Sequence, residues 1–180
     1  MSQSRTDKFQ TTGTILALVI SIIAMITSIY EANIMKSQQK AMVWPYIKAG
    51  EVYNSEGFNV KVYNNGTGPA IIKSIEVTYK DHLIKDVNQL LDSLRPGRTF
   101  GYDIVINNDI NNYVFKSGEE VIVFGFTWNP ETREAINNIQ YVDMKIAYES
   151  VLGDQWLYDS KKDTHEKDKE FKARIEYNKD

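Results

Sequence analysis

The sequence predicts a mainly β protein in which an N-terminal transmembrane helix precedes an antiparallel β-sandwich of immunoglobulin-like type. The run from Thr11 to Tyr30 carries no charge, and a helix of about 20 residues reaches about 30 Å, the thickness of a bilayer's hydrocarbon core. Beyond Pro45, short segments rich in Val, Ile, Tyr and Phe are separated by turn residues, which is typical of a sandwich. A β-barrel is the alternative architecture.

The chain divides into five predicted parts. They are an N-terminal flank at 1–10, the transmembrane helix at 11–30, a helical stalk at 31–43, the β-sandwich domain at 44–160 and a charged tail at 161–180. The stalk contains good helix formers and neither Gly nor Pro. We expect Pro45 to end the helix, and the membrane-proximal junction to consist of Trp44, Pro45 and Tyr46.

The apolar run is predicted to be an uncleaved, single-pass anchor. Arg5 and Lys8 before it also resemble the start of a signal peptide, but the run is long for such a peptide and no A-x-A-like cleavage site occurs at Ser28–Ala32. Lysines and arginines on its two sides are nearly balanced. Their slight excess after the run favours a cytoplasmic C-terminal domain under the positive-inside rule.

Small residues recur along the predicted transmembrane helix at steps of four, four, three and four, which places them on one face. Such a face lets helices approach closely in lipid, so it predicts an oligomer interface. Hydroxyl groups seven residues apart would also give a ring of helices a sparsely polar pore lining. The alternative is that membrane helices simply contain many small residues. The residues of the predicted interface or pore lining are Gly13, Thr14, Ala17, Ser21, Ala24 and Ser28.

The β-domain is predicted to contain short strands and one short helix. The helix is VNQLLDSL, with Asp86 as its N-cap. VIVFGFTW is almost wholly apolar and should be a central strand buried on both sides. The expected strands lie at 46–53, 58–63, 70–80, 83–85, 99–106, 113–115, 121–128, 142–150 and 155–160.

A glycine-rich stretch, NNGTGP, is predicted to be a structural turn formed by Asn65, Gly66, Gly68 and Pro69. It contains G-x-G but lacks the third glycine and the βαβ setting of a phosphate-binding loop. The polar loop at 107–112 is a candidate recognition loop. The tail at 161–180 is predicted to be a solvated or partly disordered extension.

Composition argues against an enzyme. The chain of 180 residues has no cysteine, which excludes disulfides, thiolate metal sites and cysteine nucleophiles. Its two histidines, His82 and His165, lack catalytic partner patterns and are expected to be exposed. The β-domain carries the acidic excess, so no nucleic-acid binding is expected. We predict no cofactor and no metal, and we expect Arg95, Arg98 and Arg133 to be salt-bridged surface residues.

Two local patterns resemble a family of small bacterial membrane proteins. WPYI at 44–47 and VYNNGTGPAIIKSIEVTY at 62–79 carry W-P-Y and N-x-G-x-G-P-A signatures, and IAYESVLGDQW at 146–156 is also similar. The resemblance covers residues 10–160 and implies one N-terminal helix followed by a β-sandwich.

The size, the single span and the Asn/Ile-rich composition also resemble the accessory membrane proteins of RNA-targeting type VI-B CRISPR systems. That resemblance implies a homo-oligomeric, pore-like assembly in the bacterial inner membrane that acts in antiviral defence. The nuclease signature proposed for such accessories, Arg followed after four to six residues by His, does not occur before His82 or His165. RNase activity is therefore not implied.

Two functions remain open from the sequence. The first is a non-enzymatic, homo-oligomeric, pore-like membrane effector whose partners are lipid and its own copies. The second is a membrane-anchored binding module whose loops or edge strand recruit a protein partner.

Overall fold

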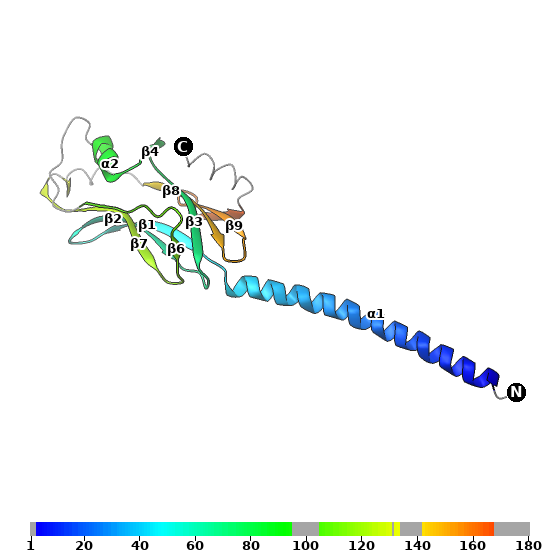
Figure 1. Ribbon diagram of the computed structural model, residues 1–180. Coiled ribbons are helices and arrows are strands. Elements are labelled where there is room, and N and C mark those ends of the chain that lie inside the picture. Colours follow the sequence, from blue (N-terminus) through cyan, green and yellow to red (C-terminus); the bar gives the residue numbers. More distant parts are fainter. Residues whose placement is uncertain (1–2, 95–104, 131, 134–141, 168–180) are drawn as a thin grey trace. The chain divides into compact units, whose positions relative to one another are not determined.

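The computed structural model describes residues 3–94, 105–130, 132–133 and 142–167 (Figure 1). The chain divides into two compact units, Met1–Met42 and Val43–Asp180. The first unit contains helix α1, and the second, the β-domain, contains the other described helices and strands.

Helix α1 runs without interruption over Gln3–Met42. Its stretch Phe9–Met42 is long and apolar enough to cross a membrane, which includes the run at 11–30 that the sequence singled out. The helix continues through the predicted stalk because that segment has no Gly or Pro. It ends shortly before Pro45, whose ring disfavours helical backbone at the preceding residue.

The β-domain consists of two antiparallel sheets. The first sheet has the order β1-β2-β7-β5, with bounds Ile47–Tyr53, Gly57–Asn64, Glu120–Thr127 and Val105–Asn107. The second has the order β10-β9-β8-β3-β4, with bounds Thr164–Lys167, Gln155–Asp159, Asp143–Ser150, Ala70–Tyr79 and His82–Leu83. Strand β6, Val114–Phe115, pairs with the start of β3, on the edge that faces away from β8.

The strand order confirms the immunoglobulin-like sandwich. In that fold, one sheet has the order A-B-E-D and the other contains G-F-C. Strands β1, β2, β7 and β5 occupy the A, B, E and D positions, and β9, β8 and β3 occupy G, F and C. Strand β4 follows β3 and pairs with it, as strand C′ does.

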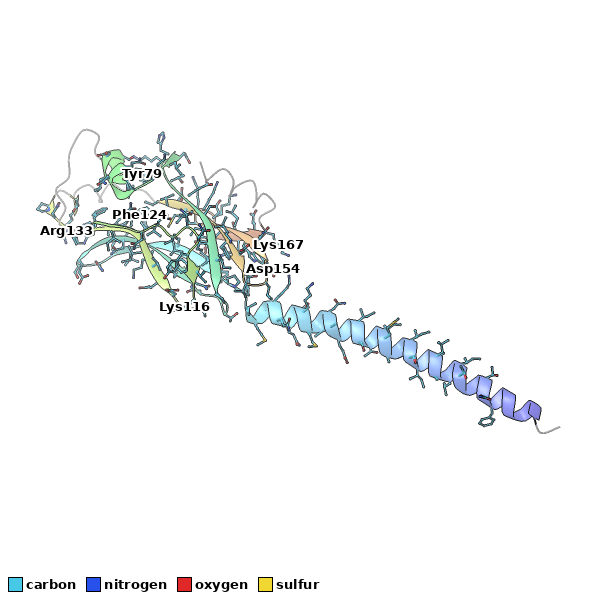
Figure 2. The ribbon with its side chains drawn as sticks, viewed as in Figure 1. Tyr79, Lys116, Phe124, Arg133, Asp154 and Lys167 are labelled. Carbon is cyan, nitrogen blue, oxygen red and sulfur yellow. The ribbon has the colours of Figure 1, made fainter. Side chains whose placement is uncertain are left out.

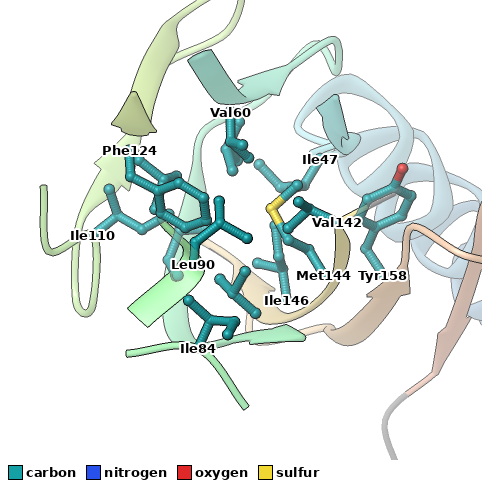
Figure 3. Close-up of a cluster of buried hydrophobic side chains, with 14 of the residues drawn as sticks. Ile47, Val60, Ile84, Leu90, Ile110, Phe124, Val142, Met144, Ile146 and Tyr158 are labelled. Atoms are coloured by element: carbon teal, nitrogen blue, oxygen red, sulfur yellow. The ribbon is translucent and has the colours of Figure 1, made fainter. Parts of the chain in front are cut away.

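The core lies between the two sheets. Phe58, Val60 and Val62 of β2 are buried at alternate positions, as the period-two pattern predicts. Figure 3 shows side chains of the first sheet facing Met144 and Ile146 of β8. Strand β7 is central, between β2 and β5, and its residues 123–126 are all buried, which confirms the interpretation of the apolar run VIVFGFTW.

The short helix α2, Val87–Leu94, forms where the sequence predicts it. Its N-terminus is capped because the backbone N–H of Gln89 donates to Asp86 Oδ1 at 2.9 Å. The Gln89 side chain in turn accepts the N–H of Lys85 at 2.9 Å. Leu90 and Leu91 are buried in the core, so packing holds a helix that is too short to be stable alone.

The main difference from the sequence prediction is strand β10, Thr164–Lys167, which lies inside the predicted charged tail. Charge composition indicated a solvated segment, but β10 pairs with β9 and its residue His165 is half-buried. Of the strand predicted at 99–106, only β5 at Val105–Asn107 is described. The rest of that strand lies outside the described residues, and so do Arg95, Arg98 and residues 168–180.

Candidate functional site

The described residues contain no group of three or more His, Cys, Asp or Glu side chains placed to hold a metal ion. Asp143 and Glu149 each pair with a lysine: Asp143 Oδ2 lies 3.5 Å from Lys161 Nζ, and Glu149 Oε1 lies 2.8 Å from Lys73 Nζ. Four features of the structure are candidate sites: a lock at the start of the β-domain, a covered strand edge, a cleft and the face of α1.

Asn64, the last residue of β2, is the centre of the lock. Its side chain is fully buried. Its Oδ1 accepts the backbone N–H groups of Tyr46 and Gly66, both at 3.0 Å. Its Nδ2 donates to the carbonyl of Gly68 at 2.8 Å and to that of Lys116 at 3.2 Å. One amide side chain thus joins the junction, the turn and the loop before β7.

The backbone of the turn also binds the junction directly. Asn65 N–H donates to Tyr46 O at 2.8 Å, and Thr67 N–H donates to Trp44 O at 3.0 Å. A Cβ added at Gly66 would lie 2.3 Å from Trp44 O, and one at Gly68 would lie 2.2 Å from Val43 O. Only glycine allows this approach of two backbones. We call residues 43–46 and 64–68 the junction lock.

The junction lock brings together two groups of residues that were predicted separately from the sequence. Trp44, Pro45 and Tyr46 were expected as a membrane-proximal junction, and Asn65, Gly66, Gly68 and Pro69 as a turn. The structure packs the turn against the junction. Sequence reasoning missed Asn64 as the linking residue, although it is the first residue of the N-x-G-x-G-P-A signature.

Strand β10 closes the first part of the free edge of β1. His165 Nε2 lies 2.6 Å from Ile47 O, and its ring stacks on Tyr46 with centroids 4.2 Å apart. Lys48 Nζ forms an ion pair with Asp163 Oδ2 at 2.8 Å. The expectation that His165 is an exposed surface residue is therefore wrong, because β1 and the aromatic rings cover it. His82, by contrast, is exposed.

The ion pair between Lys48 and Asp163 shifts the pKa values of both groups. The hydrogen bond from Lys48 holds the pKa of Asp163 below its usual value of 3.8. The same hydrogen bond raises the pKa of Lys48 above its usual value of 10.5. Nearby, burial raises the pKa of Tyr158 to about 12. Both partners of this ion pair are therefore charged at neutral pH, because the pKa of Asp163 lies below its usual value and that of Lys48 lies above its own.

A cleft of about 710 Å³ lies beside β1, beyond the residues that contact His165 and Asp163. Its lining includes Ala49 and Tyr53 of β1, Met144 of β8 and Lys161 after β9. Backbone N–H and C=O groups along β1 alternate in direction, as in any edge strand. The carbonyl of Tyr46 accepts a hydrogen bond from Asn65, on the side of β2, whereas the carbonyl of Ile47 faces His165 on the other side. The odd-numbered residues of β1 therefore direct their backbone groups away from β2. The volume lies within the usual range of ligand sites, about 300–1,000 Å³.

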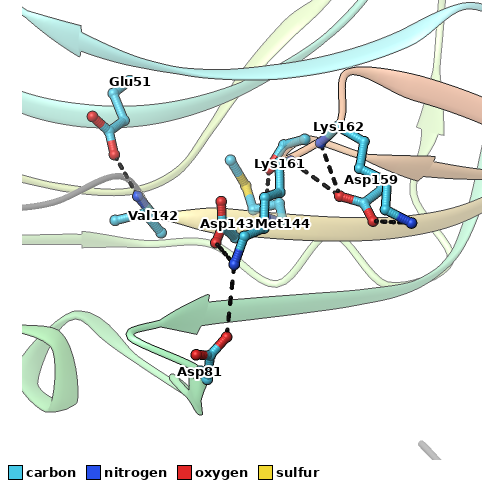
Figure 4. A network of polar contacts seen from close by, with 9 residues as sticks. Glu51, Asp81, Val142, Asp143, Met144, Asp159, Lys161 and Lys162 are labelled. Carbon is cyan, nitrogen blue, oxygen red and sulfur yellow. Dashed lines mark hydrogen bonds and ion pairs between the residues drawn. The ribbon is translucent and has the colours of Figure 1, made fainter.

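Polar contacts fix the rim of the cleft (Figure 4). Glu51 Oε1 accepts the N–H of Val142 at 2.7 Å, which connects the two sheets across the cleft. Lys161 Nζ lies 3.5 Å from Asp143 and 3.7 Å from Asp81. The rim is therefore mixed in charge over an apolar floor.

The predicted face of α1 is exposed along the helix. Thr14 Oγ1 donates to Gln10 O at 3.0 Å, and Ser21 Oγ donates to Ala17 O at 2.8 Å. Because these hydroxyl groups donate hydrogen bonds within the helix, placing them among lipid chains costs little free energy. A Cβ at Gly13 would meet no atom within 4 Å, so the fold of one chain does not require glycine there.

The polar loop at 107–112 is anchored to the rest of the β-domain at two points. Ile110 is buried in the core, and Asn108 N–H donates to Val123 O at 2.7 Å. Arg133, expected in a surface salt bridge, lies over the Trp128 ring at 5.6 Å.

The junction lock predicts a sharp difference between glycines. Gly66→Ala and Gly68→Ala should unfold the β-domain at lower denaturant than the wild type, because each added Cβ overlaps the junction backbone. Asn64→Ala should cost about 1–3 kcal/mol, because Tyr46 and Gly66 lose their acceptor. Urea unfolding of the full chain in detergent, followed by tryptophan fluorescence, measures this. Gly50→Ala is the control, since its Cβ would make an ordinary 3.7 Å contact; equal loss in Gly50→Ala and Gly66→Ala would contradict the lock.

The closed edge predicts a pH dependence. The pKa of Asp163 is depressed in the folded chain, so its stabilising contribution is complete above its usual value of 3.8 and is lost as pH falls through the folded pKa. Asp163→Asn should therefore lower the urea midpoint at neutral pH and match the wild type at pH well below 3.8. Asp81→Asn, at a more exposed ion pair, is the control and should change little. A deficit of Asp163→Asn that persisted in acid would show that the charge is not its cause.

Comparison with known families gives one match. The family model described as Domain of unknown function (DUF8453) matches residues 11–175. This range includes the apolar run, the junction lock and β10. No curated protein and no solved structure matches the chain. Because the match spans most of its length, the chain belongs to the family described as Domain of unknown function (DUF8453).

Proposed function

We propose that this protein is a non-enzymatic, single-pass membrane protein that self-assembles into a homo-oligomer through its anchor helix. The observation that supports this most is the face of α1 that carries Gly13, Ala17 and Ser21. It is exposed, its side chains are small, and the hydroxyl donor of Ser21 is satisfied internally. In lipid, close backbone approach is what associates helices, and such a face permits it.

The resemblance to type VI-B accessory proteins supports a finer proposal. The oligomer forms a pore-like assembly in the bacterial inner membrane, with the β-domain in the cytoplasm, and acts in antiviral defence. Thr14, Ser21 and Ser28 recur every seven residues and would line such a pore. Each oxygen that donates within the helix keeps lone pairs that can accept a hydrogen bond from water.

The assembly proposal predicts which helix substitutions matter. Ser21→Leu and Ala24→Leu should each weaken self-association about tenfold, about 1.4 kcal/mol, because a branched side chain holds two helices apart. Light scattering of the full chain in detergent gives the mass as a function of protein concentration. Ile26→Leu, a volume-conserving change on the opposite face, is the control and should leave the mass unchanged. A wild-type chain that is monomeric in detergent would contradict the proposal. For the pore, dye leakage from vesicles should fall in the same variants.

The cleft favours a second candidate function, a membrane-anchored module that binds an extended peptide segment of a protein partner. Glu51 and Tyr53 of β1 line the cleft beyond Ala49, whose backbone is hydrogen-bonded to Tyr158, and an edge strand can accept another strand. The apolar floor with a charged rim resembles the usual composition of a ligand site.

The binding candidate predicts that blocking the cleft abolishes capture. Peptides selected from a displayed library on the full chain should bind Lys161→Trp at least tenfold more weakly, because Lys161 lines the cleft and an indole would fill it. The matched control is Lys162→Trp, a neighbouring exposed lysine outside the cleft lining. Fluorescence anisotropy measures both affinities. Equal binding by the two variants would exclude the cleft as the site.

A further inference from the structure

The turn of the junction lock contains the chain's one Asn-Gly pair, Asn65–Gly66. An asparagine that precedes glycine is prone to deamidation, because glycine has no Cβ to obstruct attack by its backbone nitrogen on the neighbouring side-chain amide. The Asn65 side chain is exposed, so water reaches it. Residue type, neighbour and exposure together make Asn65 a candidate site of covalent modification.

Deamidation at Asn65 requires water as its only co-reactant. The backbone nitrogen of Gly66 forms a bond to Cγ of Asn65, the bond between Cγ and Nδ2 breaks, and ammonia leaves with the proton that Gly66 N–H gives up. The product is a succinimide, a five-membered ring whose nitrogen carries no hydrogen. Water then opens the ring at either carbonyl and leaves aspartate or isoaspartate, and isoaspartate has one additional carbon in the backbone.

The closed lock holds the reacting nitrogen in a hydrogen bond that the succinimide cannot keep. Gly66 N–H donates to Oδ1 of Asn64 at 3.0 Å, and the Asn64 side chain is fully buried. Because the succinimide nitrogen has no hydrogen, ring closure would remove this donor from a buried acceptor, which costs free energy. The Asn65 N–H also donates to Tyr46 O at 2.8 Å. Both backbone nitrogens of the Asn-Gly pair are therefore engaged while the lock is closed.

The loop between β6 and β7, where Figure 2 labels Lys116, holds the other side of the turn. The Ser117 hydroxyl donates to Gly66 O at 2.6 Å, and Asn64 Nδ2 donates to Lys116 O at 3.2 Å. Hydrogen bonds on both sides of Gly66 thus oppose the movement that would bring its nitrogen to bonding distance from Asn65 Cγ.

We propose that Asn65 is a deamidation site gated by the junction lock: its amide persists while the lock is closed and reacts when the lock opens. Isoaspartate then prevents the lock from closing again, because the additional backbone carbon displaces residues that lie against the junction. The space there is small, since a Cβ at Gly66 would lie 2.3 Å from Trp44 O. Neither self-assembly through α1 nor peptide binding in the cleft is needed for this reaction.

The gate is tested by comparing the rate of deamidation with the lock closed and open. The full chain in detergent is kept at mildly alkaline pH, and peptide mapping by mass spectrometry measures the fraction of Asn65 whose amide has become a carboxylate. The same chain in guanidinium chloride gives the rate with the lock open. We expect a rate at least about tenfold lower in the folded chain, because only the open fraction reacts. Equal rates in the two conditions would overturn the proposal, and so would an unfolded chain in which Asn65 does not react.

Variants of the lock should accelerate the reaction in the folded chain. Asn64→Ala should raise the rate at Asn65 about tenfold, because Gly66 N–H loses its acceptor. Ser117→Ala is a milder change that removes one exposed hydroxyl donor to Gly66 O, and it should raise the rate by a smaller factor. Gly50→Ala, outside the lock, is the matched control and should react at the wild-type rate. Wild-type rates in both lock variants would contradict the gate.

The effect of isoaspartate is measured on the deamidated chain itself. Chromatography separates the isoaspartate form, which we expect to unfold at a lower urea midpoint than the wild type. Asn65→Asp is the matched control, because it carries the same charge without the additional backbone carbon, and it should unfold at the wild-type midpoint. An isoaspartate form with the same midpoint as Asn65→Asp would show that the product does not hold the lock open.

Discussion

The buried side chain of Asn64 is the interaction on which the rest of the β-domain depends. Its oxygen holds the segment that follows α1, and its nitrogen holds the turn before β3 and the loop before β7. Because the Asn64 side chain is fully buried, each of these hydrogen bonds is strong, and each would be costly to leave unmade. The lock therefore fixes where the chain enters the sandwich. Gly66 and Gly68 complete it because any larger residue would force the two backbones apart.

The second constraint is the edge of β1 that does not pair with β2. The first part of this edge is covered by other side chains, and the later part borders the cleft. His165 of β10 and Asp163, which directly precedes that strand, cover the first part. Their side chains contact Ile47 and Lys48 of β1 across the gap between the two sheets. An uncovered edge is a template for another strand, so covering it limits unwanted pairing. The later part of β1 borders the cleft. One strand thus provides both the closure of the sandwich and the surface that favours peptide binding.

Several polar groups of the β-domain are engaged within the fold. Asp143 and Glu149 form ion pairs with lysines, and the His165 ring stacks on Tyr46, whereas His82 is exposed. The two proposed functions use different elements: the small-residue face of α1 for assembly and the cleft for peptide binding. Membrane anchoring would raise the local concentration of the β-domains and allow weak contacts between them to matter.

Local signals in the sequence determined the helix, the strand pattern and the cap at Asp86, because apolar periodicity, Gly and Pro act over a few residues. They also determined that Gly66 and Gly68 form a turn. Only the tertiary structure decided what that turn contacts, since Asn64 and Tyr46 are 18 positions apart. The same holds for His165, whose charged neighbours indicated a solvated tail although Ile47, 118 positions away, binds it. Contacts over such separations leave no periodic trace in the sequence, so the lock, the closed edge and the cleft required the folded chain.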